Sequence, residues 1–300
     1  MQIKRFLPSL TGGTADLLFY FTGLYRLILK EKPTTGCLIL MYHSLSRELK
    51  KLGYRYANTE KIFQEHLKFI RSHQIEAISL SEAIFRIKNQ EKFQDLCVAI
   101  TFDDGWRDNY EIGYNLLRYY NIPATIFLIP NLVGYPSFPP CLGNPVFSER
   151  RVNLPRVMLN WEEIDKMKKD DLITFGSHTL THHDLTKIPE DTARKEIVDS
   201  KKYLERKLND SVSFFCYPGG NYNEETVMMV QEAGYKAAVT TIEKINKEGE
   251  NLFELGRINA AKYMLYPGSE KLSQLNFNVS YFVAETTGFR SLRRRQKERT

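Results

Sequence analysis

Two adjacent carboxylates follow one of the most apolar runs of the chain. The stretch "FDDG" (102–105) places Asp103 and Asp104 side by side at the end of the run "LCVAITF" (96–102). Neighbouring residues of a strand point to opposite faces, so both aspartates can serve one site only where the strand has ended. Gly105 supplies the backbone freedom for such a turn. Taken alone, the stretch is equally typical of an Asp-Gly turn that caps a helix.

A histidine cluster changes that interpretation. In "SHTLTHH" (177–183), His178 precedes His182 by four residues, a spacing typical of metal ligands, and the cluster follows a second apolar run. Asp104 together with these two histidines makes a three-ligand site with one open position, as hydrolytic metal centres require. His183 is adjacent to His182 and would point elsewhere, so we interpret it as structural.

The two clusters together predict metal-assisted hydrolysis. A divalent cation lowers the pKa of its bound water from about 15.7 toward about 7. The aspartate that is not a ligand can then accept the proton of that water as a general base. An Asp-His-His donor set suits one Zn²⁺ ion, although Co²⁺, Ni²⁺ and Fe²⁺ also accept imidazole and carboxylate ligands.

Apolar runs and amphipathic segments alternate along the chain, which is typical of a parallel sheet covered by helices. The runs that predict strands are 37–42, 76–80, 96–102, 124–130, 172–176, 212–217, 236–241 and 254–260. The segments that predict helices are 60–73, 108–121, 160–169, 189–208 and 223–235. Seven or eight such units predict an α/β fold, a distorted (β/α) barrel in which chemistry sits on the loops after the strands.

The chain divides into a predicted barrel and two terminal segments. We expect an amphipathic helical segment over 1–36, the catalytic barrel over 37–262 and an extension with a basic tail over 263–300. Neither terminus shows a convincing signal peptide or membrane-spanning run, which favours a cytoplasmic or membrane-peripheral location. The basic tail allows peripheral membrane contact or plain solvation, and we expect no nucleic-acid partner. The proline-rich connection 131–159 should overhang the active face.

Three motifs in order resemble those of the polysaccharide deacetylases, the NodB-homology or carbohydrate esterase family 4. "TFDDG" and "SHTLTH" are similar to the first two motifs of that family, and "FCYPGG" (215–220) is similar to the third. The similarity extends from about residue 38 to residue 260. It implies the same distorted (β/α) barrel that the alternation of strands and helices predicts.

The resemblance also implies roles for individual residues. Asp103 corresponds to the general base, and Asp104, His178 and His182 correspond to the metal ligands. The backbone N–H of Gly219 lies where the family stabilises the oxyanion.

Two aromatic residues beside these motifs complete the predicted substrate contacts. Tyr217 belongs to the third motif, and Trp106 follows the aspartates and could stack on a sugar ring. Tyr135, Phe138 and Trp161 are weaker candidates for such stacking.

The chain departs from the family pattern at two positions. Cys216 stands where the third motif usually carries an arginine that supports the base, and Arg257 is a candidate to replace it. No histidine follows His183, so the usual C-terminal acid is missing. His43, at the end of the run 37–42, then becomes the candidate general acid. This arrangement resembles the branch that includes the poly-N-acetylglucosamine deacetylases.

The predicted function is metal-dependent removal of N-acetyl groups from a sugar polymer or glycoconjugate. Removal of O-acetyl esters, or deformylation of a related glycan, would use the same site. A non-catalytic glycan-binding barrel is a further alternative, which the absence of the motif arginine at Cys216 keeps open.

Overall fold

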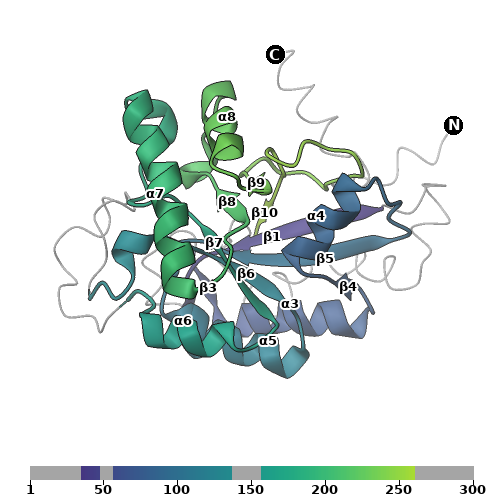
Figure 1. Cartoon of the computed structure of the whole chain (residues 1–300). Coiled ribbons are helices and arrows are strands. Elements are labelled where there is room, and N and C mark those ends of the chain that lie inside the picture. The colour runs from purple at the N-terminus through teal and green to yellow at the C-terminus, as the bar shows by residue number, and fades with distance from the viewer. Residues whose placement is uncertain (1–34, 48–56, 137–156, 261–300) are drawn as a thin grey trace, which may run out of the picture. The chain divides into compact units, whose positions relative to one another are not determined.

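A curved parallel sheet covered by helices forms the centre of the computed structural model (Figure 1). The structure describes residues 35–47, 57–136 and 157–260, which belong to one compact unit. The predicted terminal segments and most of the 131–159 connection lie outside these residues. Within the described part of the chain, every helix is too short or too polar to cross a membrane.

The main sheet is wholly parallel, as the alternation of elements predicts. Its strands follow the order β10-β1-β5-β6-β7-β8-β9, and the short β4 pairs with β5. Their bounds are β1 Gly36–Tyr42, β4 Glu76–Ala77, β5 Leu96–Phe102, β6 Ala124–Leu128, β7 Ile173–Ser177, β8 Phe214–Cys216, β9 Ala237–Val239 and β10 Ile258–Asn259. A separate small pair joins β2 Leu45–Ser46 to β3 Asn58–Thr59.

The two edges of the main sheet approach one another, which gives the distorted barrel that the sequence predicts. Val239 of β9 forms a parallel bridge with Leu255, and Leu255 lies just before β10. The backbone N–H of Thr240 and the carbonyl of Leu255 add a hydrogen bond of 2.8 Å to this bridge. Because β10 pairs in turn with β1, the sheet curls around a buried interior.

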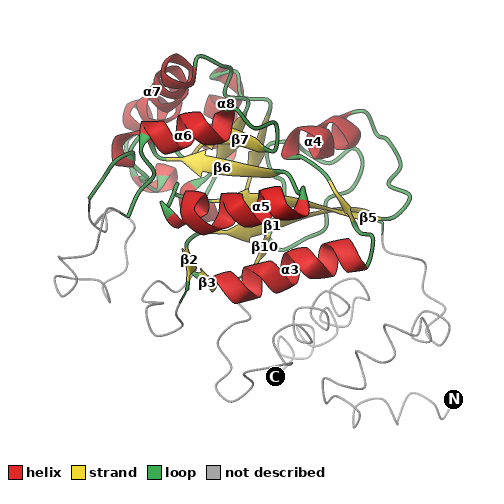
Figure 2. Cartoon of the chain, turned by 90° about the horizontal axis from the view of Figure 1, so that it is seen from below, coloured by secondary structure: helices red, strands yellow, loops and turns green. Residues whose placement is uncertain are grey.

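Helices on the outside bury one apolar face each against the strands. Their bounds are α3 Glu60–Ser72, α4 Leu80–Lys88, α5 Asn115–Tyr120, α6 Trp161–Lys168, α7 Glu190–Leu208 and α8 Glu224–Glu232. In α3, Phe63, Leu67 and Ile70 are buried at helical spacing, and the Thr59 hydroxyl accepts the N–H of Ile62 at the N-terminus. Figure 2 shows α3, α5 and α6 in a row across the strands.

Three local expectations need correction. The run 76–80 predicts a strand, but only Glu76–Ala77 pairs, because the Ser79 hydroxyl accepts the N–H of Glu82 and α4 begins at Leu80. The run 254–260 yields only the two-residue β10. The helix predicted over 108–121 begins as a π-helical turn, Asn109–Tyr114, before it continues as α5.

Candidate active site

The predicted site residues gather at the carboxyl ends of four strands. Asp103 and Asp104 follow β5, and His43 follows β1. His178 follows β7, and Tyr217 follows β8. Because parallel strands end at the same edge of the sheet, residues that are distant in sequence meet there.

Asp104, His178 and His182 lie close enough to share one metal ion. One potential ligand atom from each of them lies within 4.8 Å of those of the other two. Oδ1 of Asp104 is 3.6 Å from Nε2 of His178 and 3.7 Å from Nε2 of His182. The side chains of Asp104 and His178 are 2% exposed, whereas that of His182 is 17% exposed. The group therefore opens to solvent on the His182 side.

The tautomer of His178 suits a metal ligand. Its Nδ1 lies 2.8 Å from the carbonyl oxygen of Cys216, and a carbonyl can only accept a hydrogen bond. Nδ1 must therefore carry the proton, which leaves a lone pair on Nε2, the atom that faces Asp104. Burial lowers the pKa of His178 to about 3, so the ring is neutral at physiological pH.

Trp106 holds the other oxygen of Asp104. Its indole Nε1 donates a 2.9 Å hydrogen bond to Oδ2 of Asp104, while Oδ1 faces the two histidines. The Trp106 side chain packs with Ile129 and Met158 and is only 4% exposed. This position differs from the sugar-stacking role suggested by the sequence, because a buried ring offers little face to a substrate. It suits a residue that orients Asp104.

The loop that carries both histidines is fixed from α7. The carboxylate of the buried Glu196 accepts hydrogen bonds from the backbone N–H groups of Leu180 and Thr181 and from the Thr181 hydroxyl. The Thr179 hydroxyl accepts the N–H of His182 at 2.9 Å. Glu196 was not predicted from the sequence, although its place beside the buried positions Ala193, Ile197 and Ser200 of one helix was an available signal.

Three residues in the loops of the site have a left-handed backbone conformation. Asp104 has a φ of 74°, Thr179 of 63° and His182 of 67°, all in the left-handed region that residues with a side chain rarely adopt. Such conformations persist where the surrounding structure fixes them, and they are concentrated at functional sites.

Asp103 is paired with Arg257 inside the barrel. Nη1 and Nη2 of Arg257 donate hydrogen bonds of 2.7 and 2.8 Å to the two carboxylate oxygens of Asp103. Arg257 also donates to the Thr240 carbonyl at 2.9 Å and to the Thr101 hydroxyl at 3.1 Å. Its Nη2 lies 3.2 Å from Sγ of Cys216, the position that lacks the motif arginine. The guanidinium thus reaches the candidate base from the segment just before β10.

Electrostatics keep Asp103 ionised. Burial by itself would raise the pKa of the Asp103 carboxyl, but the charge and hydrogen bonds of Arg257 outweigh it and hold the pKa well below its usual range. Arg257 and Asp103 are both buried, so each is paired with the other and not with water. Asp103 is therefore a carboxylate at neutral pH.

His43 faces Asp103 from the neighbouring strand end. Its Nε2 lies 3.8 Å from Oδ2 of Asp103, and its side chain is 10% exposed. Burial lowers the pKa of His43, while the negative charges of Asp104 and Asp103 act in the opposite direction. The side-chain amide of Asn109 donates a 2.7 Å hydrogen bond to the His43 carbonyl and fixes the backbone at this point.

The third motif forms a tight turn after β8. Gly219 has a φ of 64°, which favours glycine, and the N–H of Gly220 donates to the Tyr217 carbonyl at 2.8 Å. Tyr217 is fully buried, with its ring stacked on that of Tyr222 at a centroid distance of 5.2 Å. Tyr217 is therefore buried behind the turn, whereas Gly219 is exposed at its tip.

The chain is similar in sequence to known polysaccharide deacetylases. Residues 90–238 match the family model of the polysaccharide deacetylases. A putative polysaccharide deacetylase of Bacillus subtilis, YxkH, is 29% identical over 234 residues, which are 78% of this chain and 74% of that protein. A poly-beta-1,6-N-acetyl-D-glucosamine N-deacetylase of Staphylococcus aureus is 29% identical over 227 residues, which are 73% of this chain and 71% of that protein.

Solved structures show the same fold. The Streptococcus pyogenes deacetylase PplD, in complex with acetate, aligns with a TM-score of 0.62 and 26% identity over 76% of this chain and 92% of its own. IcaB from Ammonifex degensii aligns with a TM-score of 0.65 and 22% identity over 81% of this chain and 97% of its own. Residues 90–238 therefore form a domain of the polysaccharide deacetylase family.

Proposed function

We propose that this protein removes N-acetyl groups from an N-acetylated sugar polymer or glycoconjugate, in a reaction that depends on a divalent metal. The observation that carries the proposal is the pair of neighbouring carboxylates with different environments. Asp104 faces two imidazole nitrogens, whereas Asp103 is held by Arg257. The different partners of the two carboxylates suit Asp104 to the role of metal ligand and Asp103 to that of general base. The name of the Staphylococcus aureus relative points to poly-N-acetylglucosamine as the class of substrate.

The residues present fit a divalent ion. The tautomer of His178 directs a lone pair toward Asp104, and Trp106 leaves Oδ1 of Asp104 to face the histidines. Asp104, His178 and His182 would hold the ion, and this oxygen and nitrogen donor set suits Zn²⁺ first. The chemistry supplied by such an ion is Lewis-acid activation of water and of the amide carbonyl.

Asp103 takes the role of general base. Each of its oxygens accepts one hydrogen bond from Arg257 and keeps a further lone pair, with which it can take a proton from the attacking water. Arg257 is a positioning residue, because it acts through Asp103 and is buried away from any substrate. This contact argues against a non-catalytic barrel, since Arg257 pairs with the candidate base although Cys216 stands at the position of the motif arginine.

His43 takes the role of general acid, and the tip of the third motif binds the oxyanion. Nε2 of His43 lies 3.8 Å from Oδ2 of Asp103, and the protonated ring can deliver its proton to the departing amine. The backbone N–H of Gly219 lies at an exposed turn and can donate to the developing negative charge. Acetate and a free amino sugar are then the products.

The direct test is acetate release from N-acetylglucosamine oligosaccharides of β-1,6 linkage. We expect release by the metal-loaded protein, its loss after treatment with a chelator and its return when Zn²⁺ is added. A matched set of O-acetylated glycans measures ester hydrolysis in parallel. Release of acetate from esters alone, or unchanged release after the metal has been removed, would overturn the proposal.

A further inference from the structure

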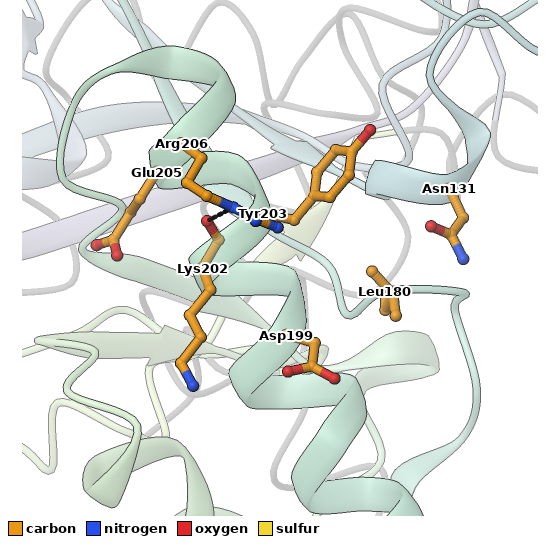
Figure 3. A pocket seen from close by; sticks show the side chains of 7 residues that line it. All are labelled: Asn131, Leu180, Asp199, Lys202, Tyr203, Glu205 and Arg206. Atoms are coloured by element: carbon orange, nitrogen blue, oxygen red, sulfur yellow. Dashed lines mark hydrogen bonds between the residues drawn. The ribbon is translucent and has the colours of Figure 1, made fainter.

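A concave surface lies beside the histidine loop, outside the residues assigned above. It has a volume of about 730 Å³, within the range of small-molecule sites. Its lining comes from α7, from the loop after β6 and from the loop after β7 (Figure 3). The lining residues are Asn131, Leu180, Asp199, Lys202, Tyr203, Glu205 and Arg206.

The side chains that face one another in this pocket are of mixed chemistry. Figure 3 shows the Tyr203 ring, Leu180, Asn131 and Asp199 on the same side of α7. An aromatic ring beside an aliphatic side chain provides an apolar wall for the faces of a sugar ring. An amide and a carboxylate provide acceptors and donors for hydroxyl and acetamido groups. This combination suits a neutral sugar unit.

The charged residues of the lining balance one another in sign, with Asp199 and Glu205 against Lys202 and Arg206. Glu205 accepts hydrogen bonds from Lys201 at 3.0 Å and from the N–H of Val212 at 3.1 Å. Nε of Arg206 donates to the backbone carbonyl of Lys202 at 3.3 Å. The pocket is therefore not built around a single charge, which argues against a small anion as its ligand.

The Tyr203 ring is held in place before any ligand arrives. It packs against Trp161 at a centroid distance of 6.1 Å, and the Arg206 guanidinium lies 5.9 Å from its centroid. Lys207 Nζ lies 5.6 Å from the centre of the Trp161 ring and closes the same cluster. A ring fixed in this way loses little conformational entropy on binding.

The position of the pocket connects it to the catalytic centre. Leu180, in its wall, lies between the two histidines that follow β7, and its carbonyl accepts the N–H of Asn131 at 3.2 Å. Its N–H donates to Glu196, which fixes the histidine loop from α7. A sugar bound in the pocket would thus contact, through Leu180, the loop that supplies His178 and His182.

We propose that this pocket is a further sugar-binding subsite, which holds another unit of the polymer while the catalytic centre acts on one N-acetyl group. The sugar ring stacks on Tyr203, and Asn131 and Asp199 accept or donate hydrogen bonds at its edge. The inference rests on the proposed function for the identity of the ligand as an N-acetylated glycan. It makes the protein select long chains over short ones.

The test compares chain lengths in two measurements. Binding of β-1,6-linked N-acetylglucosamine oligosaccharides of one to six units is measured by calorimetry on the metal-free full chain, where no turnover occurs. KM and kcat for acetate release are measured on the metal-loaded protein. We expect the affinity of the wild type to rise with chain length by about tenfold, and Tyr203→Ala to abolish this gain. We also expect Tyr203→Ala to raise KM for the six-unit chain far more than it changes kcat.

Three further variants keep the test decisive. Tyr203→Phe preserves the stacking face and should bind as the wild type does. Tyr119→Ala removes a tyrosine that is 79% exposed on α5 and should have no effect. Asn131→Ala should weaken the binding of long chains and leave the packing of Tyr203 on Trp161 unchanged. It therefore tests the subsite even if the Tyr203→Ala variant does not fold.

The outcomes separate the subsite from the proposed function. Equal binding of the six-unit chain by the wild type, Tyr203→Ala and Asn131→Ala overturns the subsite, even when acetate is released normally. Length-dependent binding that Tyr203→Ala abolishes supports the subsite, even when the wild type releases no acetate and the proposed function fails.

Discussion

The two halves of the barrel are held together in different ways. In the first half, β1 and β5 pair in register along their whole length, from Gly36 opposite Leu96 to Tyr42 opposite Phe102. In the second half, β8 and β9 have three residues each and β10 has two. There, buried polar side chains supplement the short ladders.

Asn246 and Arg257 are the main polar connections of the second half. The side chain of Asn246 bonds to both backbone groups of Gly256 and to the Cys37 carbonyl. Arg257 joins the Thr240 carbonyl to Asp103 at the end of β5. The long strands thus position Asp103 and Asp104. The short half supplies the positive charge of Arg257, which keeps Asp103 ionised.

Replacing the base should produce the largest effect. We expect Asp103→Asn to lower kcat for acetate release by roughly a hundredfold to ten-thousandfold, because an amide cannot accept the proton of the attacking water. Asp95→Asn, at the opposite end of the same strand, is the matched control. Steady-state kinetics with metal-loaded proteins measures both, and a fully active Asp103→Asn would remove Asp103 from the mechanism.

The substitution Arg257→Met tests how far the stability of the short half depends on the arginine. The loss of the guanidinium leaves Asp103 buried without a partner, which is expected to lower the free energy of unfolding by about 3–5 kcal/mol. Adding Asp103→Asn should restore part of that stability but none of the activity. Urea denaturation measures the stabilities.

The exposed Arg118, with a side chain that is 59% exposed, provides the control for Arg257. Arg118→Met should change stability little. If Arg257→Met were as stable as Arg118→Met, the short half would not depend on the arginine.

Asn246→Ala should weaken closure without touching the catalytic residues. Each buried backbone group left without a partner costs about 1–3 kcal/mol, so the free energy of unfolding should fall by an amount in this range or above it. Thr125→Val, which removes a buried hydroxyl between β6 and β7, should cost about 1 kcal/mol or less. Equal losses in the two variants would contradict the difference between the halves.

The last prediction concerns the pH dependence of stability in the first half. Burial lowers the pKa of His66 from 6.5 to about 4, and its Nδ1 lies 2.7 Å from the hydroxyl of Tyr42 at the end of β1. Between these two pH values the unfolded chain binds a proton that the folded chain does not, so stability should fall as the pH drops through this window. His66→Gln should flatten that part of the curve. An unchanged slope would mean that His66 does not titrate in this way.

Much of the fold and the site could be predicted because both depend on local patterns. Apolar runs such as 96–102 and the motifs that follow them are contiguous in sequence, and parallel topology then brings their ends together. The helix α4 was missed, although Ser79 and the spacing of Leu80, Ile84 and Ile87 mark its start and its buried face.

Other features depend on contacts that no local pattern encodes. Trp106 is adjacent to the aspartates, yet the direction of its indole N–H toward Asp104 follows from packing against Ile129 and Met158. The extent of pairing in β10 likewise depends on how the edges of the barrel meet. The replacement of the motif arginine by Arg257 was a hypothesis from sequence, and only the geometry brings its guanidinium to Asp103.

The central claim is that Asp104, His178 and His182 share one divalent ion beside an ionised Asp103. The most direct measurement is metal content per chain after reconstitution with Zn²⁺, read together with acetate release by the same samples. The account predicts one ion per wild-type chain, its loss in His178→Ala and Asp104→Ala, and activity that follows occupancy. Full metal content in both variants, or undiminished activity in chelator-stripped protein, would contradict it.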